Sequence, residues 1–314
     1  MPRYRDALPQ LNGDIFLTDG GLETTLIFHE GMDLPLFAAF DLLKTEAGMA
    51  VLQKYFRTYL DLAAKHGVGF VLEAATWRAN PDWAAQLGYD STSLAAANRR
   101  AIDMLVDIRD SYASSLRMVI SGCVGPRGDG YVVGTQMTSD EATKYHAVQI
   151  TTFAETEADM VTAITMTYAE EAIGVATAAA GAGMPVALSF TVETDGRLPS
   201  GQLLHEAMEQ VDSETNGTPV YYMINCAHPD HFDAVLDPDA AWTARIRGVR
   251  ANASRLSHAE LDDATELDDG NPEEFGGQYA ALRRVLPNLT VLGGCCGTDH
   301  RHIEAVCVAT LAGT

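Results

Sequence analysis

The chain of 314 residues is poor in basic side chains, with 21 Lys and Arg against 43 Asp and Glu, so its formal net charge is −22. A charge of this sign excludes a protein that binds nucleic acid through a basic surface. The acidic residues are spread along the whole chain, which is typical of a solvated surface. This pattern is compatible with a monomer and with a homo-oligomer, and it says nothing specific about activity.

Long apolar runs are also missing. No stretch approaches the roughly 18 uninterrupted apolar residues that a membrane-spanning helix requires, and residues 1–19 lack the layout of a signal peptide. We therefore expect no membrane association and a cytoplasmic location. Without low-complexity tracts, short repeats or linkers rich in Pro or Ser, residues 1–314 are predicted to form one domain. The five cysteines are too few and too scattered for a disulfide framework, so we expect reduced thiols.

Eight apolar segments of strand length recur along the chain, and longer segments with helical spacing separate them. The segments are 15–18, 69–72, 118–121, 160–164, 186–190, 220–224, 246–249 and 289–292. Eight strand-helix units in a chain of this length favour a single-domain α/β fold of the (β/α)8 TIM barrel type. A doubly wound sheet is less consistent with the sequence, because neither GxGxxG nor GxxxxGK[ST] occurs.

Two local patterns predict where helices begin. Asn271 followed by Pro272 and two acids is typical of a helix start, with a cap, a proline at the first position and charges that suit the helix dipole. Thr167 followed three residues later by Glu170 has the spacing of a capping box. We therefore expect helices to start at both places.

Polar and sulfur-bearing residues stand where the predicted strands end, which in a barrel is where active sites are built. Asp19, Gly20 and Gly21 follow the first strand, Glu73 ends the second, and Asn225 with Cys226 follows the sixth. Asn252 follows the seventh strand, and Cys295 with Cys296 lies in a glycine-rich segment after the eighth. The sixth and eighth strands can aim their ends at one point above the barrel axis, so a site of three thiolates is geometrically possible.

Three thiolates suit Zn²⁺, which prefers tetrahedral ligation and would keep a fourth position open for substrate. Cys295 and Cys296 can face one ion only if the backbone leaves the strand there, which Gly293, Gly294 and Gly297 permit. Because the site would carry a net charge of −1, it is poorly suited to hydrolysis. It is better suited to binding a substrate thiol as a reactive thiolate, and so to alkyl transfer to sulfur.

The strand-end motifs resemble those of the homocysteine S-methyltransferase family, whose members are zinc-dependent (β/α)8 barrels. The matching pieces, in order, are Leu17-Thr-Asp-Gly-Gly21, Leu72-Glu-Ala-Ala-Thr76, Gly125-Pro126, Ser189-Phe-Thr191, Asn225-Cys226 and Gly293-Gly-Cys-Cys-Gly-Thr298. The resemblance implies that Cys226, Cys295 and Cys296 bind Zn²⁺ and that Asp19 and Glu73 act as catalytic and substrate-binding residues. It further implies substrate contacts from Gly20, Gly21, Asn225 and Asn252.

Two departures from the family pattern concern the acceptor. The fourth strand of the family commonly ends in Glu-Thr, and that Glu helps to hold the substrate amino group, but here Ile164 precedes Thr165. Either Glu73 or Asp19 compensates, or the acceptor is not homocysteine. After the seventh strand, the segment Arg250-Ala-Asn252-Ala-Ser254 matches the family's Pro-Asn-Ala-Gly turn only at Asn252 and Ala253.

The predicted reaction is zinc-dependent transfer of a methyl group from an onium donor to the thiol of homocysteine, giving methionine. The partners are a small thiol and a methyl donor, either a sulfonium such as S-methylmethionine or a quaternary ammonium such as betaine, and the resemblance favours the sulfonium. Trp77 could face the cationic donor or serve only in packing. Other hypotheses remain: a different acceptor thiol, a redox barrel with a Cys295–Cys296 disulfide, and a non-catalytic zinc sensor.

Overall fold

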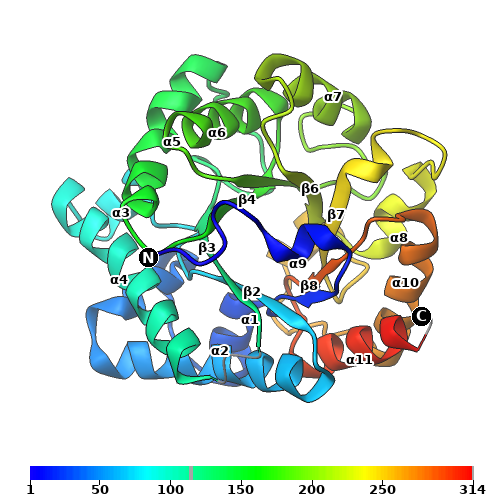
Figure 1. Cartoon of the computed structure of the whole chain (residues 1–314), viewed down its shortest axis with the longest axis horizontal. Helices are drawn as coiled ribbons and strands as arrows, with labels where there is room; N and C mark the ends of the chain where they lie inside the picture. Colours follow the sequence, from blue (N-terminus) through cyan, green and yellow to red (C-terminus); the bar gives the residue numbers. More distant parts are fainter. Residues whose placement is uncertain (113–115, 313–314) are drawn as a thin grey trace.

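Eight parallel strands form a closed barrel in sequence order, as the sequence predicts (Figure 1). The computed structural model describes residues 1–112 and 116–312. The strands are β1 (Phe16–Leu17), β2 (Gly69–Glu73), β3 (Met118–Val124), β4 (Met160–Met166), β5 (Val186–Phe190), β6 (Tyr221–Asn225), β7 (Ile246–Ala251) and β8 (Val291–Gly294). The barrel closes where Phe16 and Leu17 pair with Val291 and Leu292. The predicted (β/α)8 fold is therefore confirmed.

Helices surround the barrel and cover its strands. The longer ones are α2 (Glu46–His66), α3 (Pro81–Gln86), α4 (Ser91–Ser111), α5 (Ser139–Ala154), α6 (Ala169–Gly181), α7 (Leu204–Thr215), α10 (Pro272–Val285) and α11 (His300–Leu311). Three short helices, α1 (Leu22–Thr24), α8 (Pro229–Phe232) and α9 (His258–Asp262), follow β1, β6 and β7. Among the described helices, none is long and apolar enough to cross a bilayer.

The two predicted helix starts have different outcomes. The Asn271 side chain accepts hydrogen bonds from the backbone N–H groups of Glu273 and Glu274, so the predicted cap of α10 is confirmed. The capping box at Thr167 is wrong. Helix α6 begins at Ala169 after Tyr168, which makes no side-chain cap, and the Thr167 backbone carbonyl instead accepts a hydrogen bond from Ser200.

The amino end of the barrel is closed by apolar side chains. Phe16, Val71, Val119 and Met160 form one buried cluster inside the strands together with Leu8 of the preceding segment. The buried Asp159 carboxylate accepts hydrogen bonds from the backbone N–H groups of residues 3, 4 and 120, so it holds the amino-terminal segment over this end. Access to the barrel interior is therefore left to the opposite end.

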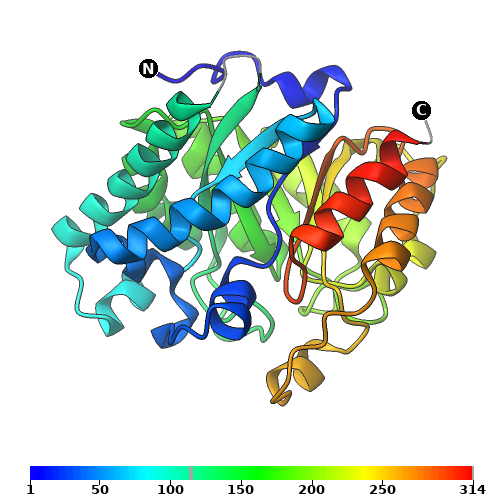
Figure 2. The same cartoon turned by 90° about the horizontal axis from the view of Figure 1, so that it is seen from below.

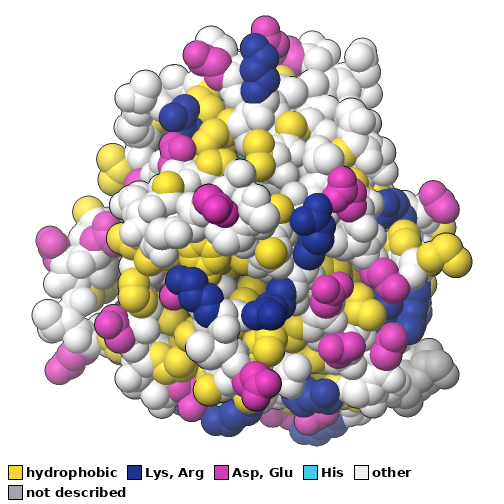
Figure 3. Space-filling view, turned by 90° about the vertical axis from the view of Figure 1, so that its left-hand side faces the viewer, with side chains coloured by type: hydrophobic (Ala, Val, Ile, Leu, Met, Phe, Trp, Pro, Cys, Tyr) yellow, Lys and Arg dark blue, Asp and Glu magenta, His cyan; other side chains and the backbone are white. Residues whose placement is uncertain are grey.

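The carboxyl ends of the strands carry the polar loops. Figure 2 shows α1 and α9 beyond these ends, at the bottom of the view, while the amino terminus lies at the top. On the side of the molecule in Figure 3, acidic and basic side chains are interspersed and do not gather in one patch. The charged side chains are thus distributed over this side of the molecule. The carboxyl ends of the strands, where the loops carry polar residues, are the expected location of an active site.

Candidate active site

The three predicted metal cysteines converge at the carboxyl end of the barrel. The sulfur atoms of Cys226, Cys295 and Cys296 all lie within 4.8 Å of one another. In this structure Cys226 and Cys295 form a disulfide, so the expectation that all cysteines are reduced is wrong here. The redox hypothesis named another pair, Cys295 and Cys296, but the structure leaves Cys296 free. Because the fold places the Cys226 and Cys295 sulfur atoms side by side, the two thiols can form a disulfide when they are oxidised.

Strand β7 joins the two cysteine-bearing segments through its backbone. The Cys226 N–H donates to the Arg250 carbonyl at 3.1 Å, and the Cys295 N–H donates to the Ala251 carbonyl at 2.8 Å. Cys226 has a φ of 53°, which is unusual for a residue other than glycine and takes the chain out of the strand direction. Gly297, with a φ of +78°, ends the turn that carries the other two cysteines. These backbone turns allow all three sulfur atoms to face one point.

Tyr131, in the loop after β3, contacts the sulfur cluster from a third direction. Its hydroxyl lies 3.5 Å from the sulfur atoms of both Cys226 and Cys296. The ring packs against His258 with a centroid distance of 4.4 Å, and the His258 Nε2 group donates to the Cys226 carbonyl. Sequence analysis missed Tyr131 because no strand-end motif marks a residue in the middle of a loop.

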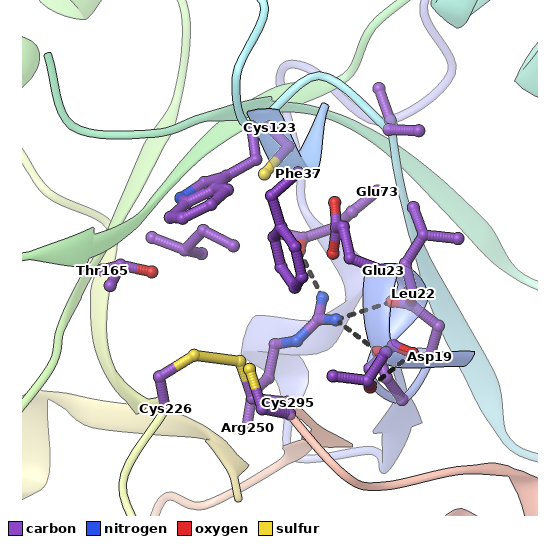
Figure 4. Close-up of a pocket in the computed structure, with 18 of the residues that line it drawn as sticks. Asp19, Leu22, Glu23, Phe37, Glu73, Cys123, Thr165, Cys226, Arg250 and Cys295 are labelled. Carbon is purple, nitrogen blue, oxygen red and sulfur yellow. Dashed lines mark hydrogen bonds and ion pairs between the residues drawn. A yellow bond between two sulfur atoms is a disulfide. The ribbon is translucent and has the colours of Figure 1, made fainter. Parts of the chain in front are cut away.

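The opposite wall of the same pocket consists of acidic residues around one arginine. Arg250 at the end of β7 forms ion pairs with Asp19 at 2.9 Å and with Glu73 at 2.5 Å, and all three side chains are at most 7% exposed. Figure 4 shows the Arg250 guanidinium between the Cys226–Cys295 pair and the two carboxylates. The structure thus places Asp19 and Glu73, both predicted to act at the substrate, in one pocket with a cation between them that the sequence analysis did not assign to the site.

The charges in this wall influence one another. Burial by itself lowers the pKa of Arg250, but the nearby charges of Asp19 and Glu73 outweigh burial and raise the pKa, so the guanidinium stays charged. Burial raises the pKa of Glu73, and the Arg250 charge opposes this rise. Tyr55 donates a hydrogen bond to Asp19 at 3.0 Å. The Arg250 cation therefore holds two buried carboxylates in place.

Glu23 is a further acid in this pocket, which we call the central pocket. The pocket is lined by Asp19, Gly20, Gly21, Leu22, Glu23, Thr24, Phe37, Glu73, Ala74, Ala75, Trp77, Cys123, Tyr131, Ile164, Thr165, Cys226, Arg250, Cys295 and Cys296. Burial raises the pKa of Glu23 to about 7, and the Asp19 charge adds to the rise. Figure 4 shows Glu23, Glu73 and Arg250 turned toward the same cavity.

Gly20 and Gly21, which were predicted to contact substrate, line the central pocket. A Cβ atom at Gly21 would come within 2.6 Å of the Cys295 carbonyl oxygen, so only glycine lets these two segments lie so close. The glycine pair therefore sets the distance between the first strand end and the cysteine turn. The Gly20 carbonyl accepts from the Tyr55 hydroxyl at 3.0 Å, and the Gly21 N–H donates to the Thr298 carbonyl at 3.0 Å, so these backbone groups already hold the glycine pair in place.

The two predicted asparagines lie outside the central pocket. Asn225 is fully buried, and its side-chain oxygen accepts hydrogen bonds from the Thr165 N–H at 2.8 Å and the Ser189 hydroxyl at 2.6 Å. Its amide nitrogen donates to the Thr165 hydroxyl. These bonds tie the ends of β4, β5 and β6 together, which is a scaffolding role. Asn252 faces a second pocket, and among the described residues none forms a hydrogen bond with its side-chain oxygen.

This second pocket, which we call the outer pocket, adjoins the central one. Both pockets are lined by Thr24, Phe37, Tyr131 and Cys296. The other residues of the outer pocket are Ile27, Phe28, Asn252, Ser254, His258, Leu261, Asp262, Ala264, Glu266, Leu267, Asp268 and Gly297. It thus combines aromatic rings with three carboxylates, and no Lys or Arg is among these residues. The surface is suited to a cationic group.

Trp77 lines the central pocket, but its ring already contacts a cationic side chain of the protein, that of Arg78. The Arg78 guanidinium lies 4.2 Å from the Trp77 ring centroid and 3.7 Å from that of Trp83. Trp77 therefore forms a cation–π contact within the protein, and the hypothesis that it faces a cationic donor gains no support.

Similarity to known proteins agrees with this geometry. Residues 16–310 match the family model for homocysteine S-methyltransferase. The chain belongs to the homocysteine S-methyltransferase family. Among solved structures, the metallated form of the homocysteine methyltransferase MmuM from Escherichia coli is 19% identical with a TM-score of 0.72, covering 94% of this chain and 96% of that one. Its oxidized form is 20% identical with a TM-score of 0.72, covering 93% and 95%. No protein with a curated description matches significantly.

As a member of this family, the chain keeps the sulfur wall and changes the acidic wall. Ile164, at the position where the family commonly has Glu, lines the central pocket with an apolar side chain. The next residue, Thr165, has a φ of 64° and is held by Asn225, so the end of β4 keeps a special backbone shape without the acid. The charged residues at this wall are therefore Asp19, Glu23, Glu73 and Arg250.

The residues of the sulfur wall fit a zinc ion. Three sulfur atoms within 4.8 Å of one another form the donor set of a site with one open position. Burial raises the pKa of the Cys296 thiol to about 11, so without a metal this thiol stays protonated at neutral pH. A divalent cation would compensate the charge of three thiolates in this place. By contrast, Cys307 is buried in the core, and Cys123 lines the pocket away from the cluster.

Proposed function

We propose that this protein is a zinc-dependent S-methyltransferase that moves a methyl group from an onium donor to the thiol of homocysteine, giving methionine. The observation that carries the proposal is the convergence of Cys226, Cys295 and Cys296 in a pocket whose opposite wall consists of carboxylates. A thiol substrate with a charged tail fits such a pocket, since sulfur chemistry and charge recognition occur at its two ends.

Zinc held by these three cysteines would lower the pKa of an incoming thiol, so that the acceptor reacts as a thiolate. The protein's own residues would position the two substrates. Arg250 forms ion pairs with the Asp19 and Glu73 carboxylates and so orients them next to the acceptor, and Tyr131 closes the loop side of the sulfur cluster. Aligning the two reactants in this way lowers the entropic cost of their encounter.

The methyl donor would approach through the outer pocket, which shares Cys296 and Tyr131 with the central one. The acceptor sulfur forms a bond to the methyl carbon while the bond from that carbon to the onium atom breaks. The electron pair of the broken bond stays with the donor, which leaves as a neutral thioether or amine. Phe28, Phe37 and Tyr131 offer ring faces to the cation, and S-methylmethionine is the donor that we favour.

The test is to incubate reduced, zinc-loaded protein with homocysteine and either S-methylmethionine or betaine. With S-methylmethionine, two methionines should form for each homocysteine consumed, one from the acceptor and one from the donor. With betaine, methionine and dimethylglycine should form in equal amounts by mass spectrometry. Cys226→Ser should form none of these products. If no donor yields methionine while zinc remains bound, the proposal is wrong.

A redox barrel is the second candidate, and the Cys226–Cys295 disulfide is the observation that favours it. In that case the disulfide would form and break reversibly, and the reduced protein would not need zinc. A reduced preparation that binds no zinc, together with a reversible thiol titration of two groups, would support this candidate over methyl transfer.

A further inference from the structure

The central pocket carries more negative than positive charge. Asp19 and Glu73 share the one cation in their contact, Arg250, so this trio has a net charge of −1. Glu23 in its ionised form brings the sum to −2 on the acidic wall. Excess negative charge at a partly buried site is costly unless a cation neutralises it, and the ligand can bring that cation.

The acids that sequence analysis named as amino-group ligands are already engaged. Glu73 forms an ion pair with Arg250. Asp19 forms an ion pair with Arg250 and accepts a hydrogen bond from the Tyr55 hydroxyl. Ile164 offers no polar atom. In residues 1–112 and 116–312, no other side chain forms a hydrogen bond or ion pair with the Glu23 carboxylate. Glu23 is therefore the acid in this pocket that remains free for a ligand.

The backbone fixes Glu23 relative to the sulfur atoms. Glu23 lies in α1, directly after the two glycines that contact the cysteine turn. The Gly21 N–H donates to the Thr298 carbonyl at 3.0 Å, and the Gly297 N–H donates to the Thr24 hydroxyl at 3.2 Å. The short helix and the turn with Cys295 and Cys296 are thus tied together on both sides of Glu23. A ligand that reaches from the sulfur atoms to this carboxylate meets a fixed spacing.

We propose that Glu23 binds the ammonium group of the acceptor, in place of the acid that is absent at position 164, so that the acceptor is a thiol with an α-amino group. This inference rests on the proposed function for the identity of the thiol, but not for the binding of an amino acid. The raised pKa of Glu23 is consistent with it. Burial and the Asp19 charge outweigh the opposing charges of Arg250 and Arg78, so an ammonium group that arrives beside the carboxyl group stabilises its anionic form.

The experiment compares amino acids with their des-amino analogues. Kinetics with homocysteine and 4-mercaptobutanoate would be measured for the wild type, Glu23→Gln and Glu23→Asp, with Glu30→Gln as the matched control. Glu30 is an exposed acid of the same segment that pairs with Lys54 and does not line the central pocket. A second measurement needs neither zinc nor turnover: binding of 2-aminobutanoate and butanoate to the reduced protein by calorimetry.

We expect Glu23→Gln to raise KM for homocysteine roughly 10- to 100-fold, the usual range for a lost hydrogen bond to a charged group, with little change for 4-mercaptobutanoate. Glu23→Asp should restore part of the affinity because it keeps the charge, and Glu30→Gln should behave as the wild type. In calorimetry, 2-aminobutanoate should bind more tightly than butanoate, and Glu23→Gln should remove the difference.

The two proposals fail in different ways. If the wild type methylates homocysteine and Glu23→Gln leaves its KM unchanged, the role of Glu23 is wrong and the proposed function stands. If no thiol is methylated but 2-aminobutanoate binds in a Glu23-dependent way, the role of Glu23 stands and the function is wrong. Equal binding of 2-aminobutanoate and butanoate by the wild type, or no binding of either, would also contradict the inference.

Discussion

The two walls of the central pocket are built in different ways. The sulfur wall comes from β6 and β8, and backbone hydrogen bonds to β7 between them bring Cys226 and Cys295 together. The acidic wall comes from side chains that meet across the barrel, since Arg250 reaches Glu73, which is 177 positions away in the chain. The sulfur wall thus depends on short motifs, whereas the acidic wall depends on which side chains happen to face one another.

This difference separates the sulfur groups from the charged groups within one pocket. The sulfur wall carries the cysteine motifs that resemble those of the homocysteine S-methyltransferase family, whereas the other wall has Ile164 where the family pattern has Glu. A change in one wall should therefore leave the other wall largely intact, which substitutions can test.

The largest effect is expected in the sulfur wall. Cys226→Ser should reduce bound zinc from near one equivalent to near none, because two remaining thiolates make a much weaker site. Elemental analysis of reduced, purified protein would measure this. Cys307→Ser, which changes a buried thiol in α11, should keep its zinc. Equal zinc content in both variants would show that the cluster is not the metal site.

The second-largest effect is expected from Arg250, the cation of the acidic wall. Arg250→Met should lower the free energy of unfolding by about 3–5 kcal/mol at pH 8, since two buried carboxylates lose their partner. The loss should shrink at lower pH, where Glu73 takes up a proton. Arg117→Met, which breaks an exposed pair with Asp14, should cost no more than about 1 kcal/mol by the same urea titration. Similar costs for the two variants would mean that Arg250 does not hold the acidic wall together.

Glu23 should have a smaller effect on stability, of opposite sign. Its folded pKa of about 7 lies above the ordinary value of 4.5, so ionisation costs stability as the pH rises from about 4.5 through 7. Glu23→Gln should therefore raise the free energy of unfolding at pH 8 by on the order of 1–2 kcal/mol and leave it unchanged at pH 4. A variant that is less stable at pH 8 would contradict the unpaired state of Glu23.

The smallest effect concerns the outer pocket. Asp262→Asn combined with Glu266→Gln should raise KM for a cationic donor about 3- to 10-fold, because both acids are exposed and act through solvent. Added salt should weaken the effect. Asp263→Asn, next to Asp262 but not part of the outer pocket, is the matched control. An unchanged KM in the double variant would show that Asp262 and Glu266 do not contribute to donor binding.

Sequence reasoning succeeded where local patterns determine structure. All eight strands were predicted within a few residues. The order of the strands made a meeting of the three cysteines geometrically possible, and the family resemblance implied it. It failed for contacts made by single side chains over long distances. Nothing near Arg250 in the sequence indicates an ion pair with Glu73. The side-chain oxygen of Asn225, which was predicted to contact substrate, instead accepts hydrogen bonds from Thr165 and Ser189. Tyr131 lies in a loop whose path depends on the whole barrel end.

The most direct test of the central claim is X-ray absorption at the zinc edge of the reduced, zinc-loaded protein. We predict three sulfur neighbours near 2.3 Å, the usual Zn–S distance, and a fourth sulfur neighbour after homocysteine is added. Fewer than three sulfur neighbours, or a spectrum that homocysteine does not change, would contradict a site in which Cys226, Cys295 and Cys296 hold the metal and leave one position for the acceptor thiol.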